Sequence, residues 1–373
     1  MSKYHIIIVG GGLAGLTAAI LLANAGREVL LIEKKKYPAH KVCGEYVSNE
    51  VLDFLKSIGF NPFDYGCSNI KRLRISTPFG KNIYMPLDLG GFGISRYVMD
   101  EQLLGIAISK GVKVLQQTKV TDVRFNNNEF IVDTDDTTFT ADFVIGSYGK
   151  RDTLDKKLNR DFIQEKTGYM GVKYHIRIKY PEDEIGLDSF SNGYCGIVKI
   201  EKDLYNLCYL YKRKGSVKSI AELESEVLFR NPVLKQLFNN AEFVYEEPLV
   251  INEISFRKKS LTENYLMLCG DAAGMIPPLC GNGMSMAIQG ARLMVGSILT
   301  HSDTKSVDSK ARESIISEYS SAWQKMFGLR LKTGRLLQQT FGNEAITAFV
   351  LNTVHAIPPL ERLLMKNTHG KPF

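Results

Sequence analysis

The sequence contains no run of about 18 uncharged apolar residues, so no membrane-spanning helix is predicted. Its cysteines lack C-x-x-C spacing and a histidine cluster beside them, which argues against a zinc site, and we predict no bound metal. They are Cys43, Cys67, Cys195, Cys208, Cys269 and Cys280. Unpaired thiols, and a first strand that begins without a signal peptide, predict a cytoplasmic protein.

A basic stripe with interleaved aromatic residues is also missing, and its absence argues against nucleic-acid binding. The net charge of +7 is spread along the chain, with short clusters at residues 34–36 and 257–259 that are typical of solvated surface. Repeats and low-complexity tails are absent too. The 373 residues, 44% of them hydrophobic, predict two domains, or one domain with a large insertion.

A glycine-rich turn at residues 10–15 joins an apolar, β-branched run to a helical segment. In this context the first glycine permits a tight turn, the second lets the backbone approach a pyrophosphate, and the third lets the helix lie close on the strand. An acid ends the next strand, 18 residues beyond the third glycine, where it can accept from ribose hydroxyls. The residues predicted to hold a dinucleotide here are Gly10, Gly12, Leu13, Ala14, Gly15 and Glu33, with Lys34 beside them.

A second turn follows another apolar strand some 260 residues later. Asp271 stands where that strand ends, a place suited to a polyol, and two glycines begin the next helix. NAD does not need this second donor-rich helix end, whereas FAD does. The candidate contacts are Gly270, Asp271, Pro278, Gly281, Asn282, Gly283 and Met284.

The remaining pattern predicts an α/β protein. Residues 72–77 and 82–85 are typical of a hairpin, helices are expected over 49–58, 220–229 and 282–298, and the segment from 168 to 253 is rich in strands. We therefore predict a discontinuous, Rossmann-type FAD-binding domain, an inserted antiparallel-sheet substrate domain and a helical C-terminus. The expected boundaries are 1–70, 90–165 and 257–300 for the first, 71–89 and 166–256 for the second, and 301–373 for the third.

At these motifs the chain resembles the FAD-dependent group that includes geranylgeranyl reductases, p-hydroxybenzoate-type hydroxylases and flavin-dependent halogenases, whose nucleotide domain is glutathione-reductase-like. The resemblance covers roughly residues 4–150 and 260–300. It implies that the first turn and Glu33 hold the ADP half of FAD, that Arg96 contacts the cofactor, and that Asp271 holds the ribityl and pyrophosphate region. It also implies that residues 281–284 lie against the flavin ring. Without the resemblance, Arg96 and Asp100 would read as a surface ion pair at a helix start.

Within that group, Lys41-Val42-Cys43-Gly44-Glu45 is similar to the Lys-x-Cys-Gly signature of the reductase branch. The resemblance places Cys43 near the flavin ring, and Lys41 and Gly44 along the cofactor. Cys43 is a catalytic candidate, with a packing role as the alternative. Glu45 is a candidate acid or base, or a helix-capping residue.

Two departures from the group bear on the reaction. Tyr148 stands where many relatives have the Asp of an Asp-Gly pair, which makes direct use of NADPH or NADH as electron donor less secure. Trp323 is the only tryptophan and the halogenase W-x-W-x-I-P motif is absent, so halogenation is disfavoured.

We expect a reductase that delivers hydride from reduced FAD to an unsaturated, apolar or isoprenoid-like small molecule. The alternatives are a monooxygenase acting through a flavin C4a-hydroperoxide, an NAD-dependent dehydrogenase, or a non-catalytic nucleotide-binding protein. His175 is expected to be structural. Apolar segments at residues 345–351 and 363–366 are expected to pack on the domain. The alternative is that they contact a membrane peripherally, which would be useful for a lipid-like substrate.

Overall fold

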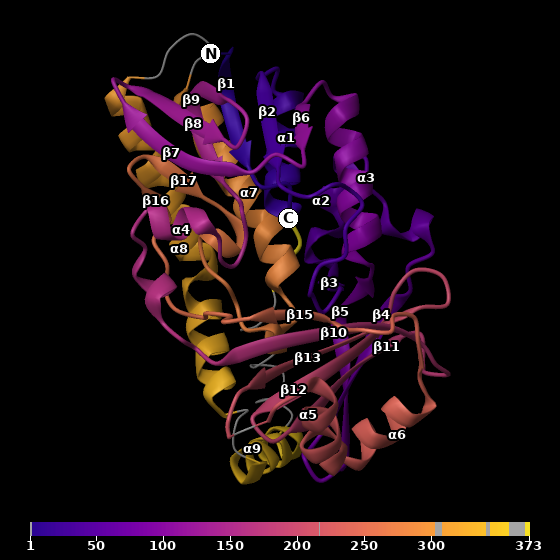
Figure 1. The fold of residues 1–373 in the computed structure, drawn as a ribbon. Coiled ribbons are helices and arrows are strands. Elements are labelled where there is room, and N and C mark those ends of the chain that lie inside the picture. Colours follow the sequence, from indigo (N-terminus) through magenta and orange to yellow (C-terminus); the bar gives the residue numbers. More distant parts are fainter. Residues whose placement is uncertain (1, 216, 303–307, 341–343, 358–369) are drawn as a thin grey trace.

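The computed structural model describes residues 2–215, 217–302, 308–340, 344–357 and 370–373. Its first sheet lies in the upper part of Figure 1 and is built on a parallel core. Residues Ile6, Ile7 and Ile8 are completely buried, as expected for a strand covered on both faces. In spatial order the strands are β16 (Thr262–Glu263), β17 (Leu266–Leu268), β9 (Thr138–Gly146), β1 (Ser2–Val9), β2 (Val29–Glu33) and β6 (Lys113–Gln116), and β7 (Val120–Asn126) and β8 (Glu129–Thr134) extend from β9.

The register of this sheet brings the ends of three strands to one edge. Val9 of β1 pairs with Ile32 of β2 and with Gly146 of β9, so the residues that follow these strands are neighbours. Helices α1 (Leu13–Asn24), α3 (Arg96–Ser109) and α7 (Gly283–His301) pack beside one another here, and α8 (Ser309–Thr340) packs on α7. The carboxyl edge of the sheet is therefore where the two predicted turns meet.

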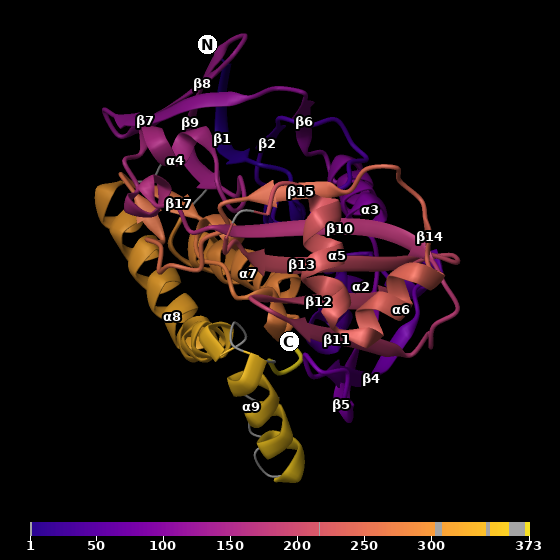
Figure 2. The same ribbon diagram turned by 60° about the horizontal axis from the view of Figure 1, so that its bottom comes forward.

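The second sheet lies below the first and crosses the molecule in Figure 2. Every described pairing in it is antiparallel except that of β4 with β11, which is parallel. In spatial order its strands are β14 (Glu242–Phe243), β10 (Tyr169–Arg177), β13 (Tyr205–Lys212), β12 (Gly193–Lys199), β11 (Glu184–Phe190), β4 (Asn69–Ser76), β5 (Asn82–Gly93) and β3 (Tyr46–Ser48), and β15 (Leu249–Asn252) pairs with β10. Strand β3 ties the loop after β2 directly to this sheet.

One face of the second sheet is covered by α5 (Ile220–Glu226) and α6 (Pro232–Asn240). Tyr174 and Tyr209 are buried there against Leu223 and Leu234. These aromatic residues are therefore sheet core. The opposite face turns toward the first sheet and takes part in the site described below.

Several helix boundaries differ from the expected ones. The expected helix at 49–58 is a 3-10 turn (Asn49–Val51) followed by α2 (Leu52–Ser57), and the expected helix at 220–229 is α5 followed by a second 3-10 turn (Leu228–Arg230). The remaining helices are α4 (Thr153–Lys157) and α9 (Glu344–Ala356), with further 3-10 turns at Pro62–Tyr65, Asp161–Gln164, Gly270–Ala272 and Pro278–Cys280. The expected apolar segment at 363–366 lies outside the described residues.

Candidate functional site

The first glycine turn connects β1 to α1 at the carboxyl edge of the parallel sheet. Gly10 has a φ of 103°, a backbone conformation that favours glycine, and its N–H donates to the Ile32 carbonyl at 2.8 Å. A Cβ on Gly15 would lie 2.6 Å from Ser147 Oγ and closer still to the Gly10 carbonyl. The helix therefore approaches the strand as closely as the fingerprint requires, and the first N–H groups of α1 face the turn.

Glu33 ends β2 directly beside this turn. Its carboxylate accepts from Gly11 N at 2.7 Å and from Lys35 N at 2.9 Å, and the residue is buried. Lys34 turns away from it and pairs with Asp152. The Glu33 carboxylate is thus fixed by backbone donors at the position where a ribose would be bound.

The second turn approaches the same edge from β17 and α7. Helix α7 begins at Gly283 without a side-chain cap on its first N–H groups, and Gly281 before it has a φ of 62°. The Asp271 carbonyl is held from behind by Lys259, whose Nζ donates to it at 2.8 Å and to the Lys150 carbonyl at 2.9 Å. Burial lowers the pKa of Lys259 to about 8.

Arg96 begins α3 between the two turns. Its guanidinium donates through Nε and Nη2 to the Asp100 carboxylate, at 2.7 and 2.8 Å, and Lys41 Nζ reaches the same carboxylate at 2.7 Å. Asp100 is almost fully buried, so this is not a surface ion pair. Burial acts to lower the pKa of Arg96, but Asp100 outweighs it and raises that pKa, which keeps the guanidinium charged.

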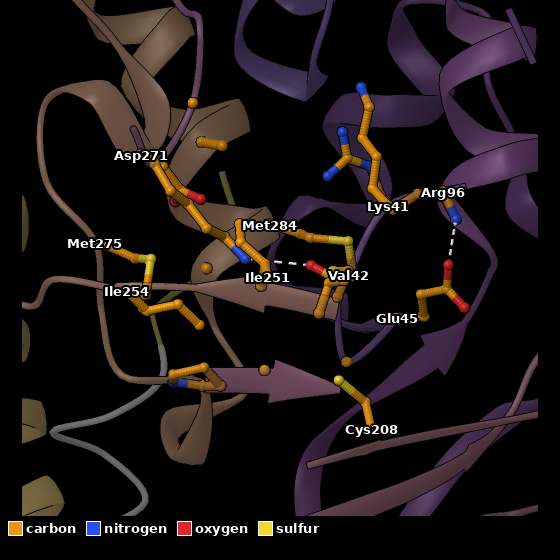
Figure 3. A pocket seen from close by; sticks show the side chains of 18 of the residues that line it. Lys41, Val42, Glu45, Arg96, Cys208, Ile251, Ile254, Asp271, Met275 and Met284 are labelled. Atoms are coloured by element: carbon orange, nitrogen blue, oxygen red, sulfur yellow. Dashed lines mark hydrogen bonds between the residues drawn. The ribbon is translucent and has the colours of Figure 1, made fainter. Parts of the chain in front are cut away.

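Glu45 lies at the end of the loop that carries Cys43, and Figure 3 shows it beside Arg96. It is completely buried, pairs with Lys173, approaches His175 Nε2 at 2.7 Å and accepts from Arg96 N at 2.7 Å. Burial acts to raise the pKa of Glu45, but Lys173 and His175 outweigh it and lower that pKa. Glu45 is therefore held as a carboxylate, an arrangement that suits positioning better than proton donation.

A cavity of about 610 Å³ connects these elements. Every predicted site residue lines it except Gly15, whose part is the close packing of α1. Asp271 lies on the opposite side of it from Lys41, Met284 extends toward Val42, and Cys208 faces it from the second sheet (Figure 3). Part of the cavity, called here the apolar chamber, is lined by aliphatic side chains and Met side chains that pack in two neighbouring clusters: Leu73, Ile75, Met85, Leu87, Val198, Leu210, Ile254, Met275, Leu279 and Leu351.

The sequence reasoning missed several residues of this cavity. Lys150 and Cys208 line it, and Lys173 lies behind Glu45. Their signal was weak: Lys173 and His175 are polar residues two apart in an otherwise apolar strand, which places both on one face of the sheet. Tyr148 lines the cavity and packs partly on the core, and burial raises its pKa.

Metal-ligand clusters and membrane-spanning helices are both absent from the described residues. No group of three or more His, Cys, Asp or Glu residues there could hold a metal ion. Among the same residues, no helix is both long and apolar enough to cross a bilayer.

The geometry of the site fits a long dinucleotide. A Cβ on Gly12 would meet only Arg96 Nη2, at 3.6 Å, and one on Gly44 would meet nothing within 4 Å, so both backbones open onto the cavity. Two donor-rich helix starts, those of α1 and α7, face a single cavity with a buried carboxylate at one end. FAD would be held by the α1 turn and Glu33 at its adenosine end and by the α7 start at its ring end.

Comparisons with known proteins agree with this geometry. A family model described as an NAD(P)-binding Rossmann-like domain matches residues 8–78. The digeranylgeranylglycerophospholipid reductase of Methanococcus vannielii is 26% identical, over 92% of this chain and 88% of its own length. Conditioned medium factor receptor 1 of Dictyostelium discoideum is 22% identical, over 88% of this chain and 68% of its own length.

Solved structures share the fold across almost the whole chain. The flavin-dependent brominase Bmp2 superposes with a TM-score of 0.78, at 16% identity, over 98% of this chain and 93% of its own. A geranylgeranyl bacteriochlorophyll reductase-like protein from Thermoplasma acidophilum gives a TM-score of 0.75, at 17% identity, over 100% of this chain and 93% of its own.

The fold, the dinucleotide site and these relatives together define an FAD-dependent oxidoreductase. The chain is similar in sequence to digeranylgeranylglycerophospholipid reductases and in fold to a geranylgeranyl reductase-like protein and flavin-dependent halogenases.

Proposed function

We propose that this protein is a reductase that saturates a carbon–carbon double bond of an apolar, isoprenoid-like molecule. The observation that carries the proposal is the single cavity that runs from the dinucleotide turns into a chamber lined by aliphatic side chains. An apolar chamber of this kind favours a hydrocarbon substrate over a charged one, because burying an unpaired charge there is costly. The names of several relatives, which are reductases of geranylgeranyl lipids, support the same substrate class.

FAD, when bound and reduced, supplies the hydride of such a reaction. The chain's own residues then have separable tasks. The α1 turn, Glu33 and Arg96 bind the cofactor, and the aliphatic side chains of β4 and β5 orient the substrate and exclude water. Cys43 lines the cavity where the loop of residues 41–45 meets the second sheet, and its Sγ–H is the proton donor that we propose for the second carbon.

A monooxygenase is the second candidate function. The structural likeness to the flavin-dependent brominase Bmp2 supports it as an alternative, because the same fold serves more than one flavin chemistry. NADPH or NADH is our proposed electron donor for either reaction. Tyr148 stands where the resemblance implies the Asp of an Asp-Gly pair, so the rates of flavin reduction by NADPH and by NADH are to be compared directly.

A lipid-like substrate would favour contact with a bilayer. Leu329, Leu336 and Phe349 on α8 and α9 are strongly exposed, and Leu337, Val350 and Leu351 of the same two helices line the cavity. Lys325 and Lys332 are exposed on the same part of α8. We propose that this apolar, basic-edged surface faces the membrane during substrate uptake.

The cofactor can be tested with the purified protein. We expect a flavin absorption band near ~450 nm, either as isolated or after reconstitution with FAD. A protein that stays colourless after reconstitution would overturn the assignment. Flavin release by heat and its identification by mass spectrometry would distinguish FAD from FMN.

The reaction can be tested with geranylgeraniol and dithionite-reduced protein under anaerobic conditions. A reductase should yield a product that has gained a pair of hydrogens for each double bond removed. Deuterated water should label it with two deuteriums per bond, because dithionite supplies only electrons and both hydrogens derive from solvent. The same substrate with reduced protein and ¹⁸O₂ should give no ¹⁸O-labelled product. Incorporation of ¹⁸O, without anaerobic hydrogenation, would instead establish the monooxygenase.

A further inference from the structure

The loop from Lys41 to Glu45 is held from the second sheet by a block of polar side chains. The cross-strand register places Lys173 opposite Cys208 and His175 opposite Asn206, so these four residues share one face of β10 and β13. That face turns toward the loop. Lys173, His175 and Asn206 are polar and almost fully buried, which is costly unless they make specific contacts.

Their contacts are made almost entirely with the loop. Asn206 Nδ2 donates to the carbonyls of Cys43 and Gly44, at 3.2 and 2.9 Å. Lys173 Nζ donates to the Lys41 carbonyl at 3.1 Å and to the Glu45 carboxylate. Four consecutive loop carbonyls are held by side chains, because Lys150 Nζ also donates to the Val42 carbonyl at 3.1 Å.

Glu45, the last residue of the loop, has a strained backbone conformation. Its φ of 55° is in the left-handed region, which is unfavourable for a glutamate unless the surroundings enforce it. The enforcing contacts are the Lys173 ion pair, His175 Nε2 at 2.7 Å and Arg96 N at 2.7 Å. His175 is in turn held through Nδ1 by the Tyr245 hydroxyl at 2.9 Å.

We propose that Asn206, Lys173 and His175 are positioning residues that fix Cys43 in the cavity where the loop of residues 41–45 meets the second sheet. The second sheet contributes side chains to the apolar chamber. It would thereby also position the Cys43 thiol, which lies on the loop that carries the predicted cofactor contacts Lys41 and Gly44. This inference rests on the proposed role of Cys43 in turnover. The position of the loop can nevertheless be measured without turnover.

The test uses the rate at which iodoacetamide alkylates Cys43, followed by peptide mass spectrometry in the full-length protein. Asn206→Leu removes both donated bonds while keeping the number and branching of the side-chain heavy atoms. We expect alkylation of Cys43 to accelerate about fivefold or more, because two hydrogen bonds of ordinary strength restrain the loop. The FAD dissociation constant, measured by flavin fluorescence, should rise in parallel because Gly44 and Lys41 move with the loop.

Asn231→Leu is the matched control. Asn231 is as buried as Asn206 and its Nδ2 donates to Ser76 Oγ and to the Thr77 and Ser189 carbonyls, far from the loop in the hydrogen-bond network. We expect it to lower the melting temperature without changing Cys43 alkylation. If both variants leave alkylation at the wild-type rate, or change it equally, the positioning role is overturned.

A second variant covers the case in which Asn206→Leu fails to fold. Lys173→Met combined with Glu45→Gln removes the buried ion pair without leaving an uncompensated charge, a replacement that proteins often tolerate. It should also accelerate Cys43 alkylation. Unchanged alkylation would overturn the positioning role while leaving the proposed reductase standing. Faster alkylation in a protein whose turnover does not depend on Cys43 would keep the positioning role and remove Cys43 as the proton donor.

Discussion

Arg96 and Asp100, one helical turn apart on α3, form a two-bond ion pair at 2.7 and 2.8 Å between the two glycine turns. Asp100 also holds Lys41 and is almost fully buried. It therefore joins the start of α3 to the loop that carries Cys43. The pair orients a guanidinium toward the cavity, where the pyrophosphate of FAD would lie.

Asp100→Asn should weaken both the fold and the cofactor site. Removing the carboxylate leaves two cations without their counter-ion, and we expect unfolding to become easier by about 2–3 kcal/mol. The FAD dissociation constant should rise about tenfold, because Arg96 loses its fixed orientation. Urea unfolding and flavin fluorescence check the two effects. Asp183→Asn is the control, since Asp183 pairs with Arg72 at an exposed site, and equal effects from both variants would contradict the prediction.

Glu33→Gln should act mainly on cofactor binding. The amide keeps the size of the side chain but loses the charge that accepts from Gly11 N and that would accept from ribose. We expect the FAD dissociation constant to rise about tenfold, a loss of about 1.4 kcal/mol. Glu28→Gln is the control. Glu28 directly precedes β2, is exposed and pairs with Lys113, so this variant should leave FAD binding unchanged. Equal affinity in the Glu33→Gln and wild-type proteins would remove Glu33 from the site.

Gly15→Ala should prevent the close approach of α1 to the sheet. The new Cβ would overlap the Gly10 carbonyl and Ser147 Oγ, so we expect a loss of about 3 kcal/mol or more, or no soluble protein. Gly105→Ala, in the interior of α3 with nothing within 4 Å, should instead stabilise the protein by about 0.5–1 kcal/mol. Thermal unfolding of both variants is the measurement. A Gly15→Ala protein as stable as the wild type would show that α1 can move away without cost.

Cys43→Ala should separate binding from turnover. The loop carbonyls remain bonded to Asn206, so FAD should still bind, while kcat for geranylgeraniol reduction should fall about 10²-fold through loss of the proton donor. Cys67→Ala is the control, because Cys67 packs on the core and burial raises its pKa to about 12. Unchanged kcat in Cys43→Ala would assign Cys43 to packing.

The stability of the protein should decrease on mild acidification. Burial lowers the pKa of His40, and His175 and Lys173 lower it further, while Glu45 and Glu201 oppose them. The unfolded chain therefore binds more protons than the folded one as the pH falls through about 6.5, and folding is disfavoured there. Burial lowers the pKa of His5 in the same direction.

His40→Gln removes one of these groups and should flatten the dependence. Urea unfolding at about pH 7.5 and about pH 5.5 gives the two free energies, and their difference should be smaller in the variant than in the wild type. The neighbours that face His40 are His175, Tyr245 and Tyr97, which remain in place. An unchanged difference between the two pH values would refute the assignment of His40.

Local chemistry made the cofactor half of the site predictable. Gly10, Gly15 and Glu33 stand at fixed spacings within one strand–turn–helix–strand unit, so a short stretch of sequence dictates their arrangement. Asp271 and Gly283 belong to a second segment, in which a strand runs through a turn into a helix, from β17 to α7. The carboxyl-edge rule for parallel strands then brings the two units together, although they are far apart in the chain.

The polar block behind the Cys43 loop could not be predicted in the same way. Lys173 and Asn206 belong to different strands, and their common face follows from a cross-strand register that no single stretch of sequence contains. Glu45 illustrates the same limit. Its sequence position suggested an acid or base, and only the burial of Lys173 and His175 against it revealed a carboxylate held by charge.

The sequence by itself determined the two glycine turns and the kind of cofactor, because each turn is set by residues close along the chain. The tertiary structure decided how the apolar chamber joins the dinucleotide site, and which side chains hold Cys43 and Glu45. Those features depend on the packing of two sheets whose residues meet across more than a hundred positions in sequence. Their geometry is set by the register and the burial of the whole fold.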